Sequence, residues 1–435
     1  MRPASMLNRR NLLTAGISFV VMTAASGMTR AEPGWVEDSI RVRCPNSLRV
    51  DRIRALRVPL GVPGDYKPCI AKLSSGELLV VAFHQQKKHR PRAGLTPAKF
   101  QEDIVLFRSR DGGLTWSPRQ VVASIAGREP CLTVLKDGTL LMTTHMNYSE
   151  VRNQEGAIYS YLYRSKDRGA TWQTLRIDWR DVPDTPKKNT LPEPFIAAWT
   201  LTGRNVLQTA EGSLILGVSS WMGHSYLWRS SDDGKTWDKT QVARFEGLQG
   251  EKLPRFRDSR DNGGFPRMDE AVFWQARSGD LLGLFRVDSR LFAPLPGTKV
   301  PQEASDHYTR MLVFRSRDSG RSWKSEPELG SYYGEMYPSI LKLADGRLLL
   351  TFTVRAVRAP LGVQAVLGRE RHDGFEFDFD HDRLVLDART PLNKPSGGGF
   401  GNTIQMKDGT LVTSYSYRGA DDQTHIEVVR WKLPE

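Results

Sequence analysis

The sequence predicts an all-β protein, a single six-bladed β-propeller formed by residues 32–435. Two observations lead to this prediction: an octapeptide that occurs four times and an apolar hairpin pattern that occurs six times. The two repeats alternate along the chain, so one architecture has to explain both. We find no linker between them that would separate a second domain.

The octapeptide has the form Ser-x-Asp-x-Gly-x-Thr/Ser-Trp, and each residue type in it suits a tight turn. The Asp side chain can accept hydrogen bonds from the backbone two residues on, and the Gly permits the positive φ at which the chain reverses. The Trp ring can hold the turn between neighbouring sheets. The four copies are Ser109–Trp116, Ser165–Trp172, Ser230–Trp237 and Ser316–Trp323.

Each copy of the second repeat is an apolar strand, a short turn ending in Gly, and another apolar strand, which is a strong hairpin signal. The turn glycines follow one another at intervals of 62, 74, 67, 67 and 63 residues. Six copies at such a period are typical of a propeller in which each hairpin belongs to one four-stranded blade. The hairpins are Pro68–Phe83, Pro130–His145, Asn205–Ser220, Glu270–Arg286, Tyr337–Arg355 and Asn402–Tyr417.

The remaining segments fit this arrangement. In four blades the octapeptide follows the hairpin as the turn between the outer strands, and His372–Phe375 is a degenerate copy in the fifth. The sixth blade ends with Ile426–Leu433, and residues 47–60 are expected to supply the strand that closes the ring. The inserts at residues 84–102, 180–204, 245–268 and 287–309 are rich in Pro, Gly and charge. They predict loops over one face, where propellers usually carry their sites.

Residues 1–31 have the features of a twin-arginine signal peptide. Arg9 and Arg10 precede a short apolar run to about Ala25, and Thr29-Arg30-Ala31 provides a small-residue cleavage site. The run is too short and too rich in small residues to span a membrane comfortably. We therefore expect export to the periplasm or beyond the cell.

Composition and charge narrow the class of partner. Removing residues 1–31 takes away four arginines and no acid, so the formal net charge falls from +13 to +9. A basic chain favours anionic partners, and without a nucleic-acid module an acidic glycan is the better candidate. Three cysteines, Cys44, Cys69 and Cys131, cannot form a disulfide framework. We predict no metal site and no cofactor.

The octapeptides are the Asp boxes of the sialidase (neuraminidase) superfamily, which this chain resembles over most of its length as a divergent bacterial member. In that family the boxes are structural and the site lies at the starts and ends of the inner strands. Asp269-Glu270, before a strand–turn–strand that ends at Arg286, is similar to the family segment whose Glu pairs with the nucleophilic Tyr and whose Arg binds the substrate carboxylate. Tyr337-Pro-Ser resembles the segment with the nucleophile, and Arg310 the third arginine of the family triad.

That constellation is chemically reasonable. A Tyr hydroxyl, with a pKa of about 10, is a poor nucleophile unless a carboxylate takes its proton. A neutral nucleophile also suits a sugar whose reacting centre carries a carboxylate, and sialidases are an exception to the two-carboxylate scheme of glycoside hydrolysis. Arginine binds such a carboxylate through its planar fork.

This sequence also departs from the family. The first family arginine lies in Arg-Ile-Pro, but here Tyr66-Lys67-Pro68 occupies that place, and its usual Glu partner falls at Thr353. Lys67 therefore becomes a candidate substitute. Arg128 is another, because Arg128-Glu129-Pro130 has the right spacing one blade later.

The general acid of the family has no obvious counterpart, because residues 84–101 contain no acidic side chain. Glu102 and Asp103 come late in that segment, and Asp103 is expected in the strand before the Asp box. Glu150 and Glu155, in the second blade, are the alternatives, and the sequence does not choose among the four.

The resemblance implies an exo-acting glycoside hydrolase that removes an acidic sugar, with Tyr337 as nucleophile and Glu270 as its base. Arg286, Arg310, Arg128, Lys67 and Asp269 are the candidates for binding the substrate. Two alternatives stay open: a propeller that binds glycans without catalysis, and a lyase acting on uronic-acid glycans. A carboxylic acid from the first or second blade that reaches Glu270 and Tyr337 would favour hydrolysis.

Overall fold

The computed structural model describes residues 35–89, 99–147, 149–153, 155, 157–181, 200–220, 225–241, 243–246, 267–288, 311–331, 334–355, 360–391 and 399–434. The predicted signal peptide and much of the four long inserts lie outside these ranges. Within them, regular structure is almost entirely β-strand, and the one short helix is η1 (Trp179–Asp181). No helix in the described part of the chain is long and apolar enough to cross a membrane.

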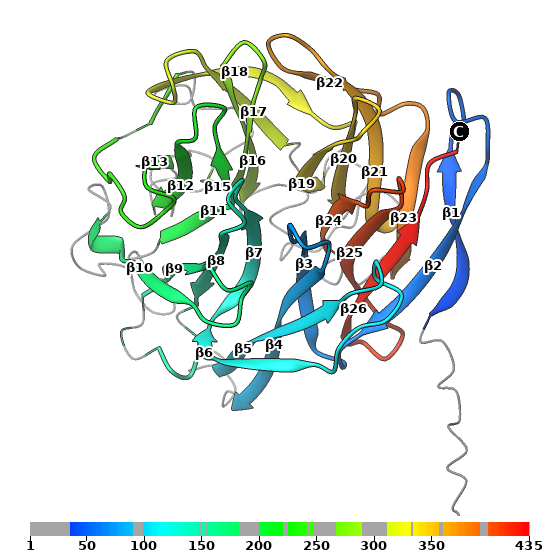
Figure 1. Ribbon diagram of the computed structural model, residues 1–435, viewed down its shortest axis with the longest axis horizontal. Helices are drawn as coiled ribbons and strands as arrows, with labels where there is room; N and C mark the ends of the chain where they lie inside the picture. The colour runs from blue at the N-terminus through cyan, green and yellow to red at the C-terminus, as the bar shows by residue number, and fades with distance from the viewer. Residues whose placement is uncertain are drawn as a thin grey trace, which may run out of the picture. The chain divides into compact units, whose positions relative to one another are not determined.

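The strands form antiparallel sheets, each of which begins with a predicted hairpin (Figure 1). The first sheet contains β3 (Asp65–Lys72), β4 (Leu78–His89), β5 (Lys99–Ser109) and β6 (Gln120–Ala126). The second contains β7 (Arg128–Val134), β8 (Leu140–Met146), β9 (Tyr159–Ser165) and β10 (Gln173–Ile177). The third contains β11 (Thr200–Gln208), β12 (Leu214–Ser220) and β13 (Ser225–Ser230). The fourth contains β15 (Arg267–Gln275), β16 (Leu281–Asp288), β17 (Met311–Ser316) and β18 (Ser322–Leu329), with β14 (Arg244–Glu246) added in parallel.

The last two hairpins belong to one ten-stranded sheet. One end contains β19 (Glu335–Lys342), β20 (Arg347–Val354), β21 (Leu361–Glu370), β23 (Arg383–Thr390) and the short β22 (Phe375–Phe377). The other end contains β24 (Gly399–Gln405), β25 (Leu411–Arg418), β26 (Thr424–Trp431) and β2 (Arg52–Leu60). The pairing of β2 with β26 is the one expected for residues 47–60. An additional strand, β1 (Val36–Arg43), pairs with both β2 and β23 and so joins the two ends.

The first strand of each hairpin, which we call the inner strand, contacts the inner strands of its two neighbours. These contacts run in a cycle, β3–β7–β11–β15–β19–β24 and back to β3. Figure 1 shows the inner strands toward the middle of the molecule, with the later strands of each sheet outside them. Apolar side chains fill the space between adjacent sheets: Leu79 and Leu106 of the first sheet share a core cluster with Leu140 and Met142 of the second.

The Asp boxes form turns between successive strands, as predicted. In the first box, Asp111 Oδ1 accepts a hydrogen bond from the Thr115 backbone N–H at 2.9 Å, four residues along the chain rather than the two predicted. The same contact recurs in the other three boxes. The Ser109 hydroxyl oxygen accepts from the N–H of Gly113, whose φ is 87°, and the Trp116 ring N–H donates to the Gly113 carbonyl oxygen. The predicted residue types are therefore all used within the turn itself.

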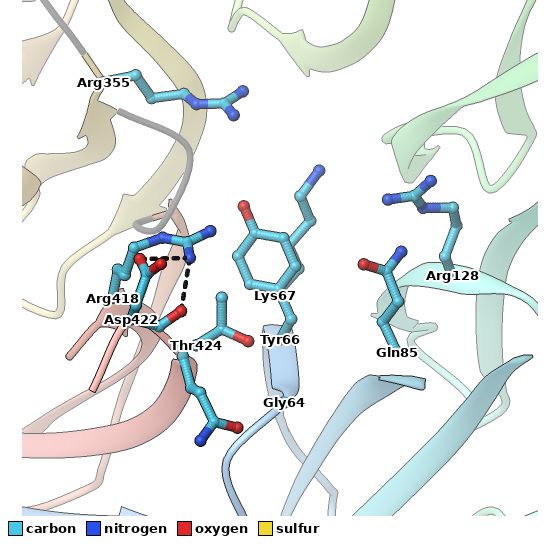
Figure 2. A pocket seen from close by; sticks show the side chains of 10 residues that line it. Gly64, Tyr66, Lys67, Gln85, Arg128, Arg355, Arg418, Asp422 and Thr424 are labelled. Atoms are coloured by element: carbon cyan, nitrogen blue, oxygen red, sulfur yellow. Dashed lines mark hydrogen bonds and ion pairs between the residues drawn. The ribbon is translucent and has the colours of Figure 1, made fainter. Parts of the chain in front are cut away.

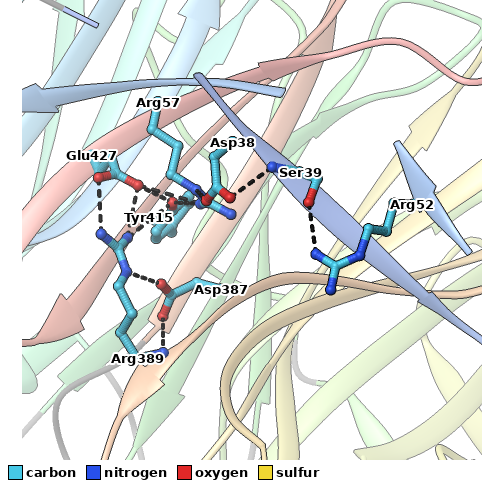
Figure 3. Close-up of polar contacts among 8 residues, drawn as sticks. All are labelled: Asp38, Ser39, Arg52, Arg57, Asp387, Arg389, Tyr415 and Glu427. Carbon is cyan, nitrogen blue, oxygen red and sulfur yellow. Dashed lines mark hydrogen bonds and ion pairs between the residues drawn. The ribbon is translucent and has the colours of Figure 1, made fainter. Parts of the chain in front are cut away.

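A buried polar network holds the N-terminal strands to the ten-stranded sheet (Figure 3). The Tyr415 hydroxyl of β25 donates to Glu427 of β26 and accepts from Arg57 of β2 and from Arg389 of β23, the last at 3.2 Å. Arg389 Nη2 lies 2.7 Å from Glu427, and Arg57 binds Asp38 of β1. Side chains of four strands thus meet at one buried hydroxyl, and Arg57 joins β1 to them through Asp38.

Trp323 provides a test of the structural role of the Asp boxes. Its ring is fully buried, packs in a cluster with Leu227 of the third sheet and Phe273 of the fourth, and donates to Gly320 O at 3.0 Å. We expect Trp323→Ala to lower the free energy of unfolding by roughly 3–5 kcal/mol, measured by urea denaturation. Trp237→Ala, in a box whose ring is only part-buried, is the control and should cost less. Equal losses would contradict this account of the turn.

Candidate active site

Every inner strand carries a bulge at the same position. The pairing register of each inner hairpin shifts there by at least one residue. In all six repeats the residue at the shift stands nine positions before the turn glycine: Lys67, Glu129, Gly203, Glu270, Tyr337 and Phe400. The five that are not glycine all have φ between 47° and 64°. Such left-handed residues cost about 1–3 kcal/mol each and cluster at functional sites.

The bulges bring these side chains together. The Tyr337 and Phe400 rings stack with their centroids 4.1 Å apart. Lys67 Nζ lies 4.0 Å from the Phe400 ring centroid and 5.5 Å from that of Tyr337, and the Arg204 guanidinium covers Phe400 at 3.8 Å. A bulge redirects a side chain out of the normal alternation of a strand. The shared bulge therefore explains how residues from separate sheets form one site.

Glu129 and Glu270 form the acidic part of this site. Glu129 is ion-paired with Lys67 and accepts a hydrogen bond from the Glu270 carboxyl, and Glu270 lies 2.7 Å from Arg286 Nη1. The strand between β7 and β15 in the cycle is β11, where Gly203 occupies the equivalent position and contributes no side chain. A hydrogen bond between two carboxyl groups needs one proton. Such a pair can hold a transferable proton when one of its two carboxyl groups is protonated.

Tyr337 lies beside this pair among several cations. Its side chain is buried, and its hydroxyl oxygen accepts a hydrogen bond from Arg355 Nη1 at 2.8 Å. The guanidinium groups of Arg286 and Arg355 lie 5.4 and 5.6 Å from the ring centroid. Because Arg286 also binds Glu270, it links the expected nucleophile to the expected base.

A cavity of about 410 Å³ opens next to these residues (Figure 2). Of the described residues that line it, four are cationic, Lys67, Arg128, Arg355 and Arg418, and one is acidic, Asp422, 3.1 Å from Arg418. Figure 2 shows Arg128 and Arg355 pointing into the space from opposite sides, above the Tyr66 ring. Arg355 lines the cavity and also binds the Tyr337 hydroxyl, so the cavity and the tyrosine are adjacent.

Burial and charge set the protonation states. Burial lowers the pKa of Lys67 to about 8, although Glu129 and Glu270 oppose the shift. Burial alone would raise the pKa of Glu129, but the charge of Lys67 and the hydrogen bond from Glu270 contribute to holding it well below its ordinary value. Burial lowers the pKa of His145, on β8, to about 3, so this imidazole is neutral near pH 7. The site thus combines a carboxylate, a weakened ammonium group and permanently charged arginines.

The four acids considered from the sequence lie in other surroundings. Glu102 is buried, accepts a hydrogen bond from Gln85 and lies 3.6 Å from Arg128, at the wall of the cavity. Asp103 and Glu150 both bind Arg152, at 2.9 and 2.8 Å.

Glu155 lies at the surface, 2.8 Å from Arg176. Of these four, only Glu102 contacts a residue that lines the cavity. Asp103 lies in β5, the strand before the first Asp box, as expected.

The other sequence candidates are placed as follows. Lys67, Arg128, Glu270, Arg286 and Tyr337 all belong to the site or line its cavity. For Asp269 the structure describes only the backbone, which pairs with Arg286 in the β15–β16 hairpin. Arg310 lies outside the described residues. Among those described, no three His, Cys, Asp or Glu side chains gather as metal ligands.

Sequence reasoning missed Glu129, Phe400, Arg355 and Arg418. A signal for the first two was present, because both stand nine residues before a turn glycine, as Tyr337 and Glu270 do. Arg355 and Arg418 end or follow the second strands of their hairpins, and each stands nine residues after a turn glycine, so a spacing signal was present for them as well.

Comparison with solved structures supports the fold. A protein of unknown function from Dyadobacter fermentans is 19% identical with a TM-score of 0.59, covering 92% of this chain and 100% of its own. The intramolecular trans-sialidase from Ruminococcus gnavus is 13% identical (TM-score 0.53; 85% and 94% coverage). The GH93 α-L-arabinofuranosidase of Fusarium graminearum is 14% identical (TM-score 0.50; 90% and 97% coverage). None of the curated proteins matches the sequence.

The sequence itself matches a family model described as a BNR repeat-like domain over residues 98–365, more than half of the chain. That range contains all four Asp boxes and the inner strands that carry Glu129, Glu270 and Tyr337. The chain therefore belongs to the BNR repeat-like domain family and has the fold of the sialidase-like β-propellers.

Proposed function

We propose that this chain is an exported, exo-acting glycoside hydrolase that removes an acidic sugar from a glycan, and that its propeller has six blades. The blade number is supported by the six inner hairpins and by the cycle of contacts among their first strands. The reaction class is supported by the similarity to a trans-sialidase and an arabinofuranosidase.

The observation that carries the proposal is the position of the cationic cavity beside Tyr337. Three arginines and Lys67 line the cavity, and one of the arginines also binds the Tyr337 hydroxyl. Arginine suits a carboxylate because its planar fork donates two parallel hydrogen bonds. Lys67 occupies the place of the first family arginine, so it takes the corresponding part of the substrate-binding role. An anionic sugar held there would lie against the nucleophile.

In the first half of the reaction the Tyr337 oxygen attacks the anomeric carbon while the bond to the leaving oxygen breaks. Glu270 starts with the proton of the carboxyl pair. It takes up the proton of Tyr337 and passes its own proton to Glu129, and Glu129 protonates the leaving oxygen. One proton enters and one leaves the pair, so its charge is unchanged. Arg355, already bonded to the Tyr337 oxygen, stabilises negative charge that develops there.

In the second half water replaces the leaving group. Glu129 accepts a proton from the water, the pair returns one to the Tyr337 oxygen, and the sugar–tyrosine bond breaks. Arg286 orients Glu270 throughout by its 2.7 Å contact. The second half reverses the proton path of the first, as microscopic reversibility requires.

Glu129 also helps to choose between hydrolysis and the two alternatives, glycan binding without catalysis and elimination from a uronic-acid glycan. Hydrolysis needs an acid near Glu270 and Tyr337, and Glu129, from the second hairpin, is hydrogen-bonded to Glu270. A site with only basic and apolar groups around Tyr337 would have favoured the alternatives. The carboxyl pair therefore favours hydrolysis.

The first experiment is turnover of a 4-methylumbelliferyl α-sialoside by the purified protein. We expect Tyr337→Phe to lower kcat on the order of 10³-fold, because the nucleophilic oxygen is removed. Tyr161→Phe, in the aromatic cluster of β9, is the control and should retain activity. No release at high enzyme concentration would contradict the sialidase reaction, and uronic-acid glycans would then be tested for elimination and for binding.

The role of Glu129 predicts a dependence on the leaving group. Glu129→Gln should lower kcat/KM for sialyllactose by roughly 10²–10⁴-fold, because its alcohol leaves only when protonated. The loss should be much smaller for the methylumbelliferyl substrate, whose leaving group departs as a stable anion. Glu102→Gln is the matched control and should show no such difference. Equal losses on both substrates would rule out Glu129 as the acid.

Binding of an anionic sugar should weaken as the pH rises through about 8. Lys67 is charged below its pKa of about 8 and neutral above it, whereas arginine keeps its charge throughout. We expect the Kd for N-acetylneuraminic acid, measured by calorimetry between pH 6.5 and 9.5, to rise on the order of tenfold across this step. In Lys67→Met the step should disappear. The same step in the variant would assign the titration to another group.

A further inference from the structure

Two cysteines lie side by side on adjacent inner strands. Cys69 of β3 and Cys131 of β7 each follow a bulge residue by two positions, after Lys67 and Glu129 respectively, and their Sγ atoms are 3.9 Å apart. Cys69 is buried and Cys131 is part-buried. The two sulfurs thus connect the same two strands that the Lys67–Glu129 ion pair connects.

The geometry suits a disulfide bond. A disulfide has an S–S length of about 2.05 Å, so each sulfur has to move by roughly 1 Å, which small rotations of the two side chains provide. The β3 and β7 strands are in direct contact, and their bulges occur at the same distance from the turn glycine.

The two thiols also differ chemically. The hydrogen bond from Cys69 lowers the pKa of Cys131 to about 7 against the effect of burial, whereas that contact and burial raise the pKa of Cys69 well above its ordinary value. Thiol–disulfide exchange starts from a thiolate. Cys131 is the more exposed of the two and is therefore the attacking group.

We propose that Cys69 and Cys131 are a modification site, at which a disulfide-bearing oxidant joins the first two inner strands through a covalent bond. The Cys131 thiolate attacks a sulfur of the oxidant and forms a mixed disulfide, releasing one thiolate. Cys69 then loses its proton and displaces the second thiolate. The two cysteines give up two electrons and two protons in total, and the oxidant is reduced to two thiols.

The bond would act on the site described above. Cys69 and Cys131 lie two residues from Lys67 and Glu129, so a covalent link holds the strands on both sides of that ion pair at a fixed spacing. The proposed export would place the chain where disulfides persist. The cross-link itself requires neither the export nor the glycosidase activity.

The test uses the full chain with Cys44→Ser, because Cys44 is exposed and would give intermolecular products. The protein is incubated with oxidised glutathione, unfolded, and treated with N-ethylmaleimide before mass spectrometry. We expect a mass about 2 Da below that of the reduced chain, no maleimide adduct, and a peptide in which Cys69 is linked to Cys131. The Tm should rise by roughly 3–6 °C and fall again on reduction with dithiothreitol.

Maleimide on both cysteines, or glutathione on either of them without the linked peptide, would overturn the proposal. A further Cys131→Ser substitution should abolish both the linked peptide and the rise in Tm. Since no substrate is involved, a negative result in the sialoside assay leaves this test unaffected.

Discussion

The active-site candidate depends on one backbone feature, the left-handed bulge repeated in the inner strands. Five side chains at that position would cost on the order of 5–15 kcal/mol together, which is comparable to the whole stability of a typical protein. The contacts that hold them, ring stacking between Tyr337 and Phe400 and the Lys67–Glu129 ion pair, have to offset that cost. A repeated strain of this size, with chemically different side chains at each copy, indicates a site rather than a structural repeat.

The one glycine at this position is as informative as the five side chains. A Cβ at Gly203 would approach the Ala271 carbonyl oxygen to 3.0 Å and the Phe273 ring to 3.6 Å, so a side chain there would crowd the neighbouring inner strand β15. The glycine therefore lets the inner strands β11 and β15 approach closely at this position. The fold supplies one equivalent bulge position in each of the six inner strands, and the residue type at each position determines the chemical groups of the candidate site.

The fold was predictable because its signals are local. An Asp box makes its hydrogen bonds within the octapeptide, and a hairpin is specified by its turn, so each can be read in a short window. Tyr337, Glu270 and Arg286 were found because their spacing matches a family. Glu129 was visible beside Arg128, but the role proposed for it depends on contact with Glu270, far along the chain. Contacts between strands of different sheets, such as that of Cys69 with Cys131, cannot be read from a single sequence.

Two tyrosines show how the same residue types serve different ends. Tyr415 and Tyr337 each contact arginine, and each lies near a Glu that binds an arginine. Tyr415 is fully buried and donates directly to Glu427, and its two arginines also bind carboxylates, although both arginines line a cavity of about 500 Å³ together with Asp38 and Asp387. Tyr337 instead binds an arginine that lines an open cavity with an excess of positive charge. Arginines that are matched by carboxylates hold strands together, whereas an excess of positive charge beside a cavity is suited to binding an anion.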